Sequence, residues 1–122
     1  MNNNYQLIDP AVLMDAAGED TEAFLQLLEV FLRIVPEMAQ RLDHAVQAGV
    51  HADLAREAHA LKSCLALVGA RTARARVEAI ERDARREGVA AANDAYLELR
   101  CDLDAIVAEA RACHAAAAGA RA

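Results

Sequence analysis

The sequence has few of the residues from which β-rich folds are built. Aromatic residues make up 3% of its 122 residues, tryptophan is absent, and alanine is the commonest residue. A chain rich in alanine, leucine, glutamate and arginine, and poor in β-branched and aromatic residues, has the composition of helices. A β-sandwich, a β-barrel or a dinucleotide-binding fold is therefore not expected, and the length fits one domain with a single core.

The sequence also lacks an excess of basic charge and any long apolar run. Lys and Arg number 13 against 19 Asp and Glu, a formal net charge of −6, whereas nucleic-acid-binding domains usually carry a basic face. No apolar run reaches the ~18 residues of a membrane span, and the N-terminus lacks the regions of a signal peptide. We therefore expect a cytoplasmic domain that binds no nucleic acid and does not insert into membranes.

Cysteine pairs and nucleotide-binding motifs are missing as well. The three cysteines, Cys64, Cys101 and Cys113, are odd in number and show no CxxC spacing, which favours reduced thiols over a disulfide framework or a zinc site. No GxGxxG, P-loop, GxSxG or HExxH motif occurs. We expect this chain to bind no metal and no cofactor, and to have no ATP site of its own.

Glycines and one Asp-Pro pair divide the chain into helical segments. Helices often end at a glycine, and five glycines follow stretches with helical patterning: Gly18, Gly49, Gly69, Gly88 and Gly119. Asp9 followed by Pro10 predicts a helix N-cap and a short helix that continues to about Ala17. Longer helices are predicted over residues 20–49, 51–68 and 72–87 and from after residue 88.

Each long segment carries one apolar stripe at helical spacing. In the last helix the stripe consists of Tyr96, Leu99, Leu103, Ile106, Ala110 and Cys113. Pro36 lies inside the first long pattern and is expected to kink or restart that helix, and residues 115–122, which have no stripe, are expected to fray. Such helices pack antiparallel. The predicted fold is an all-α, antiparallel four-helix bundle with a short additional N-terminal helix, in a single domain over residues 1–122 with its core at about 7–114.

One face of the predicted helix 51–68 has an unusual composition. At ~100° per residue, the buried stripe lies within about 40° of one direction and consists of Leu54, Ala58, Leu61, Leu65 and Val68. His59 points about 140° away from Leu54, towards solvent. Its neighbours on that face are mostly small, namely Ala52, Ala55, Ser63 and Ala66. A solvated face is normally filled with charged side chains, so small residues here would let another protein approach the imidazole.

Lys62 lies one helical turn after His59 and is the only lysine, against twelve arginines. At this spacing its ammonium can reach a group carried by the imidazole, and a flexible point charge suits a phosphoryl group. An exposed histidine is, however, usually an ordinary surface residue. His44 illustrates that alternative, because it also lies off its stripe but is surrounded by charged and polar residues.

The segment Ala58-His59-Ala60-Leu61-Lys62-Ser63-Cys64, followed by Gly69 ten positions after the histidine, resembles the signature of histidine phosphotransfer (HPt) domains of bacterial two-component phosphorelays. The resemblance covers roughly residues 7–112. It departs from the family at Ser63, where glycine is usual, and at Cys64, where serine or alanine is usual. The Ser63 hydroxymethyl group lies on the predicted docking face and is expected to tune transfer or partner choice.

The resemblance implies a phosphocarrier. His59 would accept a phosphoryl group from the aspartate of a receiver domain and pass it to another receiver, with Lys62 offsetting the phosphate charge and Mg²⁺ held by the receiver. The expected docking residues are Ala52, Ala55, Arg56, Ser63 and Ala66, and Gly69 is expected to form a structural turn. The expected partners are response-regulator receivers, with the receiver of a hybrid sensor kinase as one candidate. A monomer is expected, as a free-standing protein or as a module of such a kinase.

A second hypothesis remains open beside the phosphocarrier. The domain would be an HPt-like docking module that regulates a receiver or an enzyme by binding alone, without phosphotransfer. The departure at Ser63 is the feature that keeps this alternative open. It predicts that replacing His59 leaves signalling intact, whereas the phosphocarrier hypothesis predicts that signalling is lost.

Overall fold

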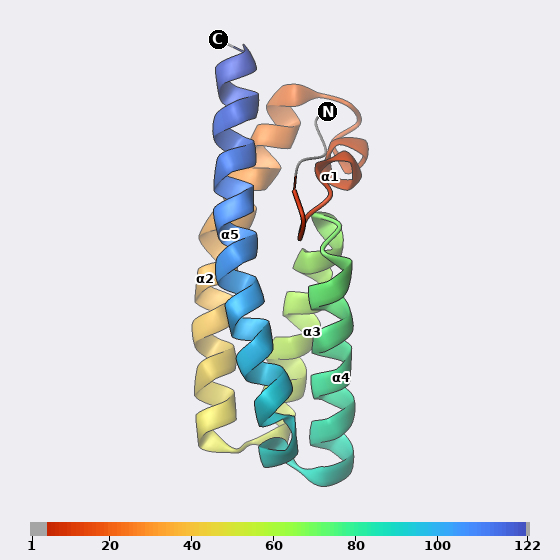
Figure 1. The fold of residues 1–122 in the computed structure, drawn as a ribbon, viewed down its shortest axis with the longest axis vertical. Helices are drawn as coiled ribbons and strands as arrows, with labels where there is room; N and C mark the ends of the chain where they lie inside the picture. The colour runs from red at the N-terminus through yellow and green to blue at the C-terminus, as the bar shows by residue number, and fades with distance from the viewer. Residues whose placement is uncertain (1–4, 122) are drawn as a thin grey trace.

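The computed structural model describes residues 5–121, which form an all-helical bundle (Figure 1). Its elements are α1 (Pro10–Ala16), α2 (Thr21–Ala48), α3 (His51–Leu67), α4 (Arg71–Glu87), the 3₁₀ helix η1 (Val89–Ala92) and α5 (Asn93–Arg121). The four long helices run side by side, and α1 lies at the end of the bundle where α3 meets α4. The predicted four-helix bundle with a short N-terminal helix is confirmed; the predicted domain limits at residues 1 and 122 lie outside the described residues.

Aspartate side chains cap the N-termini of the first two helices. The Asp9 carboxylate accepts a hydrogen bond from the Ala11 N–H, and Pro10 occupies the first turn of α1, as the sequence predicts. Asp20 caps α2 by accepting hydrogen bonds from the backbone of Glu22 and Ala23. These bonds satisfy N–H groups that have no partner inside the helix.

The longest predicted pattern is one helix, because α2 continues without a break through Pro36. The prediction that the chain restarts there is wrong. Proline removes one backbone donor and crowds the preceding turn, but the neighbouring Val35 and Ala39 are 0% and 4% exposed. Burial of this face against the bundle holds the helix together across the missing hydrogen bond.

The core lies between the four long helices and follows the apolar stripes of the sequence. All six predicted stripe residues of α5 are buried, with exposures of 8% or less. The stripe of α3 is equally complete, since Leu54, Leu61 and Leu65 are 0% exposed. Burial of a leucine side chain stabilises a fold by about 1.5–3 kcal/mol, so these stripes fix which face of each helix points outward.

The C-terminal end differs from the sequence prediction. Residues 115–122 are expected to fray, but α5 remains helical through Arg121, and Gly119 lies within the helix rather than after it; residue 122 lies outside the described residues. Alanine has the highest intrinsic helix propensity, and Ala117 and Ala118 pack partly buried against the core. Propensity and this contact extend the helix where no complete apolar stripe exists.

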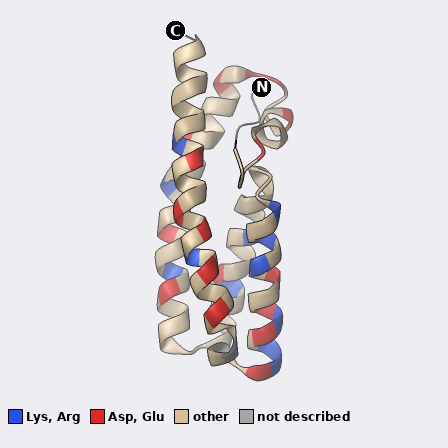
Figure 2. Cartoon of the chain, in the orientation of Figure 1, with Lys and Arg blue, Asp and Glu red and all other residues tan. Residues whose placement is uncertain are grey.

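Charge is distributed unevenly over the bundle (Figure 2). The α4 helix carries six arginines against four acidic residues, whereas acidic residues predominate along α5. Ion pairs join these helices, with Arg76 lying 2.8 Å from Glu98 and 3.1 Å from Asp102.

Within residues 5–121, no helix has the length and apolar character needed to cross a bilayer.

Candidate functional site

His59 lies on the exposed face of α3, near the middle of that helix. The position follows from the buried stripe, because Ala58 and Leu61 are 1% and 0% exposed and point into the bundle. The imidazole is exposed, and within residues 5–121 no side chain or backbone group hydrogen-bonds or ion-pairs with it. A ring nitrogen without a partner is available to an incoming group.

The other histidines have different surroundings. His44 is exposed on α2, and His51 is the first residue of α3 and half-buried. The His114 Nε2 lies 3.0 Å from the Glu29 Oε1, across the α2–α5 interface. Because Glu29 and His114 are 85 residues apart, sequence spacing does not reveal this pair.

The predicted docking residues lie around His59 on the same helix. Ala52 and Ser63 are exposed, and Ala55 and Ala66 are half-buried where α3 meets its neighbours. The side chain of Arg56 is 68% exposed, and its Nη2 lies 2.8 Å from the Asp53 Oδ1. The guanidinium is thus paired on its own helix, one turn from the histidine. The result is a surface of short side chains with one arginine.

The Lys62 side chain is held by an ion pair that the sequence does not reveal. Its Nζ lies 3.8 Å from the Glu81 Oε1 of α4, and the two side chains are 24% and 14% exposed. This separation gives an ion pair without a hydrogen bond. The only lysine of the chain is therefore held towards α4, one helical turn from the exposed imidazole.

Glu81 is the residue of this site that the sequence analysis misses. Its Oε1 is inaccessible to solvent and has no hydrogen-bond partner within the described residues. The available signal was its position next to the buried Ile80, at the edge of the α4 stripe. That position alone does not identify a partner, because the contact with Lys62 depends on how α4 packs on α3.

Cys64 and Ser63 face different environments although they are adjacent in sequence. The Cys64 Sγ lies 3.7 Å from the Met38 Sδ on α2, and burial raises the pKa of the Cys64 thiol. This thiol packs at the edge of the core. Ser63 is exposed, so its departure from the usual glycine affects the surface and not the core.

Gly69 ends α3 in a conformation that favours glycine. Its φ is +68°, and a Cβ at this position would lie 2.8 Å from the Asp9 Cβ. The Asp9 N–H also donates to the Val68 carbonyl oxygen at 2.8 Å. The turn therefore lets the segment before α1 pack closely on the end of the histidine-bearing helix.

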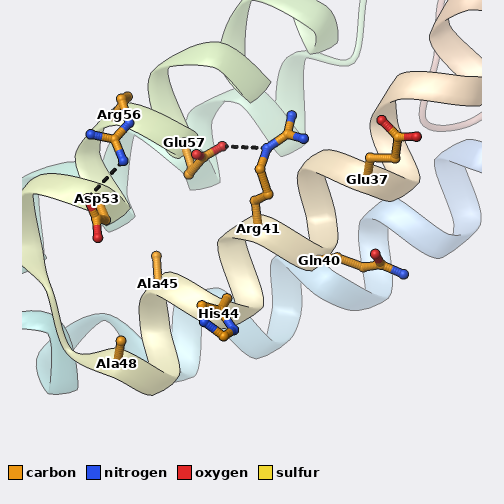
Figure 3. Close-up of a pocket in the computed structure, with 9 residues that line it drawn as sticks. All are labelled: Glu37, Gln40, Arg41, His44, Ala45, Ala48, Asp53, Arg56 and Glu57. Carbon is orange, nitrogen blue, oxygen red and sulfur yellow. Dashed lines mark hydrogen bonds and ion pairs between the residues drawn. The ribbon is translucent and has the colours of Figure 1, made fainter.

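A polar groove of about 650 Å³ lies between α3 and α2 (Figure 3). Arg41 Nε lies 3.1 Å from Glu57 Oε2 across the groove, and the Asp53–Arg56 pair lies at its rim. His44 also lines it. Arg56 belongs both to this groove and to the predicted docking residues, so the polar surface beside His59 extends onto α2.

The described residues contain no group of three or more His, Cys, Asp and Glu side chains arranged to hold a metal ion. Cys64, Cys101 and Cys113 are all free thiols. The site offers one exposed imidazole, a nearby ammonium group and a surface of mostly small side chains.

The chain is similar to a known family. The family model for the Hpt domain matches residues 26–113, well over half of the chain and including the whole of α3 and α4. No curated protein matches the chain, and no solved structure does.

Proposed function

Because the chain belongs to the Hpt domain family, a family of histidine phosphotransfer modules in phosphorelays, we propose that His59 is the residue that carries the phosphoryl group. The observation behind this assignment is the exposed imidazole of His59, which has no partner and lies one turn from the only lysine. Of the four histidines, His114 is paired with Glu29, and His44 and His51 have no lysine nearby in sequence.

The proposed reaction needs little from this chain beyond a nucleophile and a charge. The lone pair of the neutral imidazole forms the N–P bond while the aspartyl O–P bond of a receiver breaks, and the electron pair leaves with the aspartate carboxylate. Imidazole suits this step because much of it is neutral near pH 7. The more accessible nitrogen, Nε2, is the proposed acceptor. Transfer to a second receiver is the same step reversed, and the receiver supplies Mg²⁺.

Lys62 is proposed to offset the negative charge of the phosphoryl group, at the i, i+3 spacing that brings side chains together on a helix. The proposed docking surface consists of Ala52, Ala55, Arg56, Ser63 and Ala66. Apart from Arg56 their side chains are short, which supports this role because a receiver must bring its aspartate within bonding distance of the ring. Each chain carries a complete site, so the proposal requires no second copy.

The test is phosphotransfer from a pre-phosphorylated receiver, in the presence of Mg²⁺, to the wild-type chain and to His59→Gln. We expect acid-labile, base-stable phosphate on the wild-type chain and none on His59→Gln. His44→Gln is the matched control, because His44 is also an exposed histidine on a helix, near the end of α2, and it should be labelled like the wild type.

Two results would contradict the proposal. Label on His59→Gln would place the phosphoryl group elsewhere. A cognate receiver that binds the wild-type chain without labelling it would favour the alternative, a docking module that regulates its partner by binding alone.

A further inference from the structure

The environment of Glu81 makes its carboxylate dependent on Lys62. The side chain is 14% exposed, and its Oε1 has neither solvent contact nor a hydrogen bond within the described residues. A buried, ionised oxygen without hydrogen bonds is unfavourable unless a countercharge lies nearby. Lys62, with its Nζ 3.8 Å away, is the one cation paired with Glu81 in the described part of the chain.

Phosphorylation of His59 would place a second anion within reach of the same ammonium group. Lys62 lies three residues after His59, so its side chain can turn towards the phosphoryl group. As it does so, Glu81 loses part of its countercharge. The stabilisation that Lys62 gives the phosphoryl group is therefore partly offset by the loss of its ion pair with Glu81.

We propose that Glu81 is a positioning residue that competes with the phosphoryl group for Lys62 and so keeps phosphorylated His59 from becoming too stable to pass its group on. This inference rests on the proposed function of His59 and adds a determinant of the transfer equilibrium. In a carrier, a weaker hold on the phosphoryl group favours onward transfer. Glu81 therefore acts through Lys62 and not by touching the reacting atoms.

The test uses phosphoramidate, a small donor that needs no receiver. In its zwitterionic form the P–N bond breaks as the His59 N–P bond forms; ammonia leaves, and the ring keeps its other N–H. The phosphorylated fraction of the full chain is measured by ³¹P NMR over a series of phosphoramidate-to-ammonia ratios, which gives the equilibrium constant. We expect Glu81→Gln to raise this equilibrium constant about three- to tenfold, which is the size of effect that losing one partly exposed charge pair produces.

Two further variants show whether the effect runs through Lys62. Glu78→Gln removes the same charge from α4, but Glu78 is 52% exposed and pairs with Arg74 at 3.7 Å, so the constant should change less than about twofold. In a Lys62→Gln background, Glu81→Gln should also change the constant less than about twofold, because the competition no longer exists. Circular dichroism checks that every variant folds.

The outcomes separate this inference from the function on which it rests. If the wild type and Glu81→Gln share one equilibrium constant, or if Glu81→Gln has its full effect without Lys62, the role of Glu81 is refuted while His59 remains the carrier. If His59→Gln is phosphorylated as readily as the wild type, the proposed function itself is refuted.

Discussion

Gly69 and Asp9 are in direct contact at the junction between the histidine-bearing helix and the first helix. A Cβ on Gly69 would lie 2.8 Å from the Asp9 Cβ and 3.2 Å from the Asp9 carbonyl oxygen. Asp9 is also the N-cap of α1, and its N–H donates to the carbonyl of Val68. One glycine thus allows the end of α3 and the start of α1 to share a tight junction.

Gly69→Ala should therefore destabilise the fold more than an ordinary glycine replacement. Both the left-handed conformation (φ +68°) and the contact with Asp9 oppose a Cβ, for an expected loss of about 2–4 kcal/mol. Gly49→Ala is the control, because Gly49 has φ +69° but open space around it, and about 1–2 kcal/mol is expected. Urea denaturation measures both; equal losses would show that the contact is unimportant.

Ser63→Gly should alter phosphotransfer without abolishing it. Ser63 is exposed one turn after His59, so its hydroxymethyl group meets an incoming partner but not the core. We expect the transfer rate to change by less than about tenfold, and the stability to fall by about 0.5–1 kcal/mol because glycine weakens a helix. Rapid-quench transfer from a phosphorylated receiver measures the rate. An effect as large as that of His59→Gln would instead make Ser63 essential.

The three thiols should react with iodoacetamide at different rates. Burial raises the pKa of Cys64 and of Cys113, and a raised pKa leaves less of the reactive thiolate at any pH below it. Cys101 is exposed and should be alkylated first at pH 8. Cys64 and Cys113 should react at least about tenfold more slowly than Cys101, and their alkylation rates should continue to rise as the pH increases.

Mass spectrometry of digested samples assigns each modification. Unfolding in guanidinium is the control, because the three thiols should then react at similar rates. Similar rates in the native protein would contradict the burial of Cys64 and Cys113.

Glu109→Ala should release the segment that precedes α1. The Glu109 carboxylate accepts hydrogen bonds from the backbone N–H groups of Gln6, Leu7 and Ile8, at 3.0–3.3 Å. Without it, amide hydrogen exchange of residues 6–8 should accelerate by about tenfold or more, while the amides of α3 exchange as before. Glu98→Ala, which removes another carboxylate from α5, should leave residues 6–8 unchanged. Unchanged exchange in Glu109→Ala would mean that the segment is held by its apolar contacts alone.

The helices and the outward direction of His59 could be predicted from local pattern. The stripe of α3 points His59 away from the bundle whatever the neighbouring helices do, because each residue turns the helix by ~100°. The HPt signature around His59 and Gly69 likewise lies within one continuous segment. Two predictions are incorrect. A restart of the helix at Pro36 does not occur, because buried neighbours hold α2 together. The C-terminal end does not fray, because alanine favours the helix and Ala117 and Ala118 pack on the core.

The helical bundle, the exposed position of His59 and the family follow from the amino-acid sequence, because periodicity, composition and a short motif are all local properties of the chain. The pairing of Lys62 with Glu81, the pairing of His114 with Glu29 and the packing of Gly69 against Asp9 come instead from the way the helices pack. Each of these contacts joins segments that are distant in sequence. Their partners depend on how the helices pack against one another, and the pattern within any single helix does not contain that information.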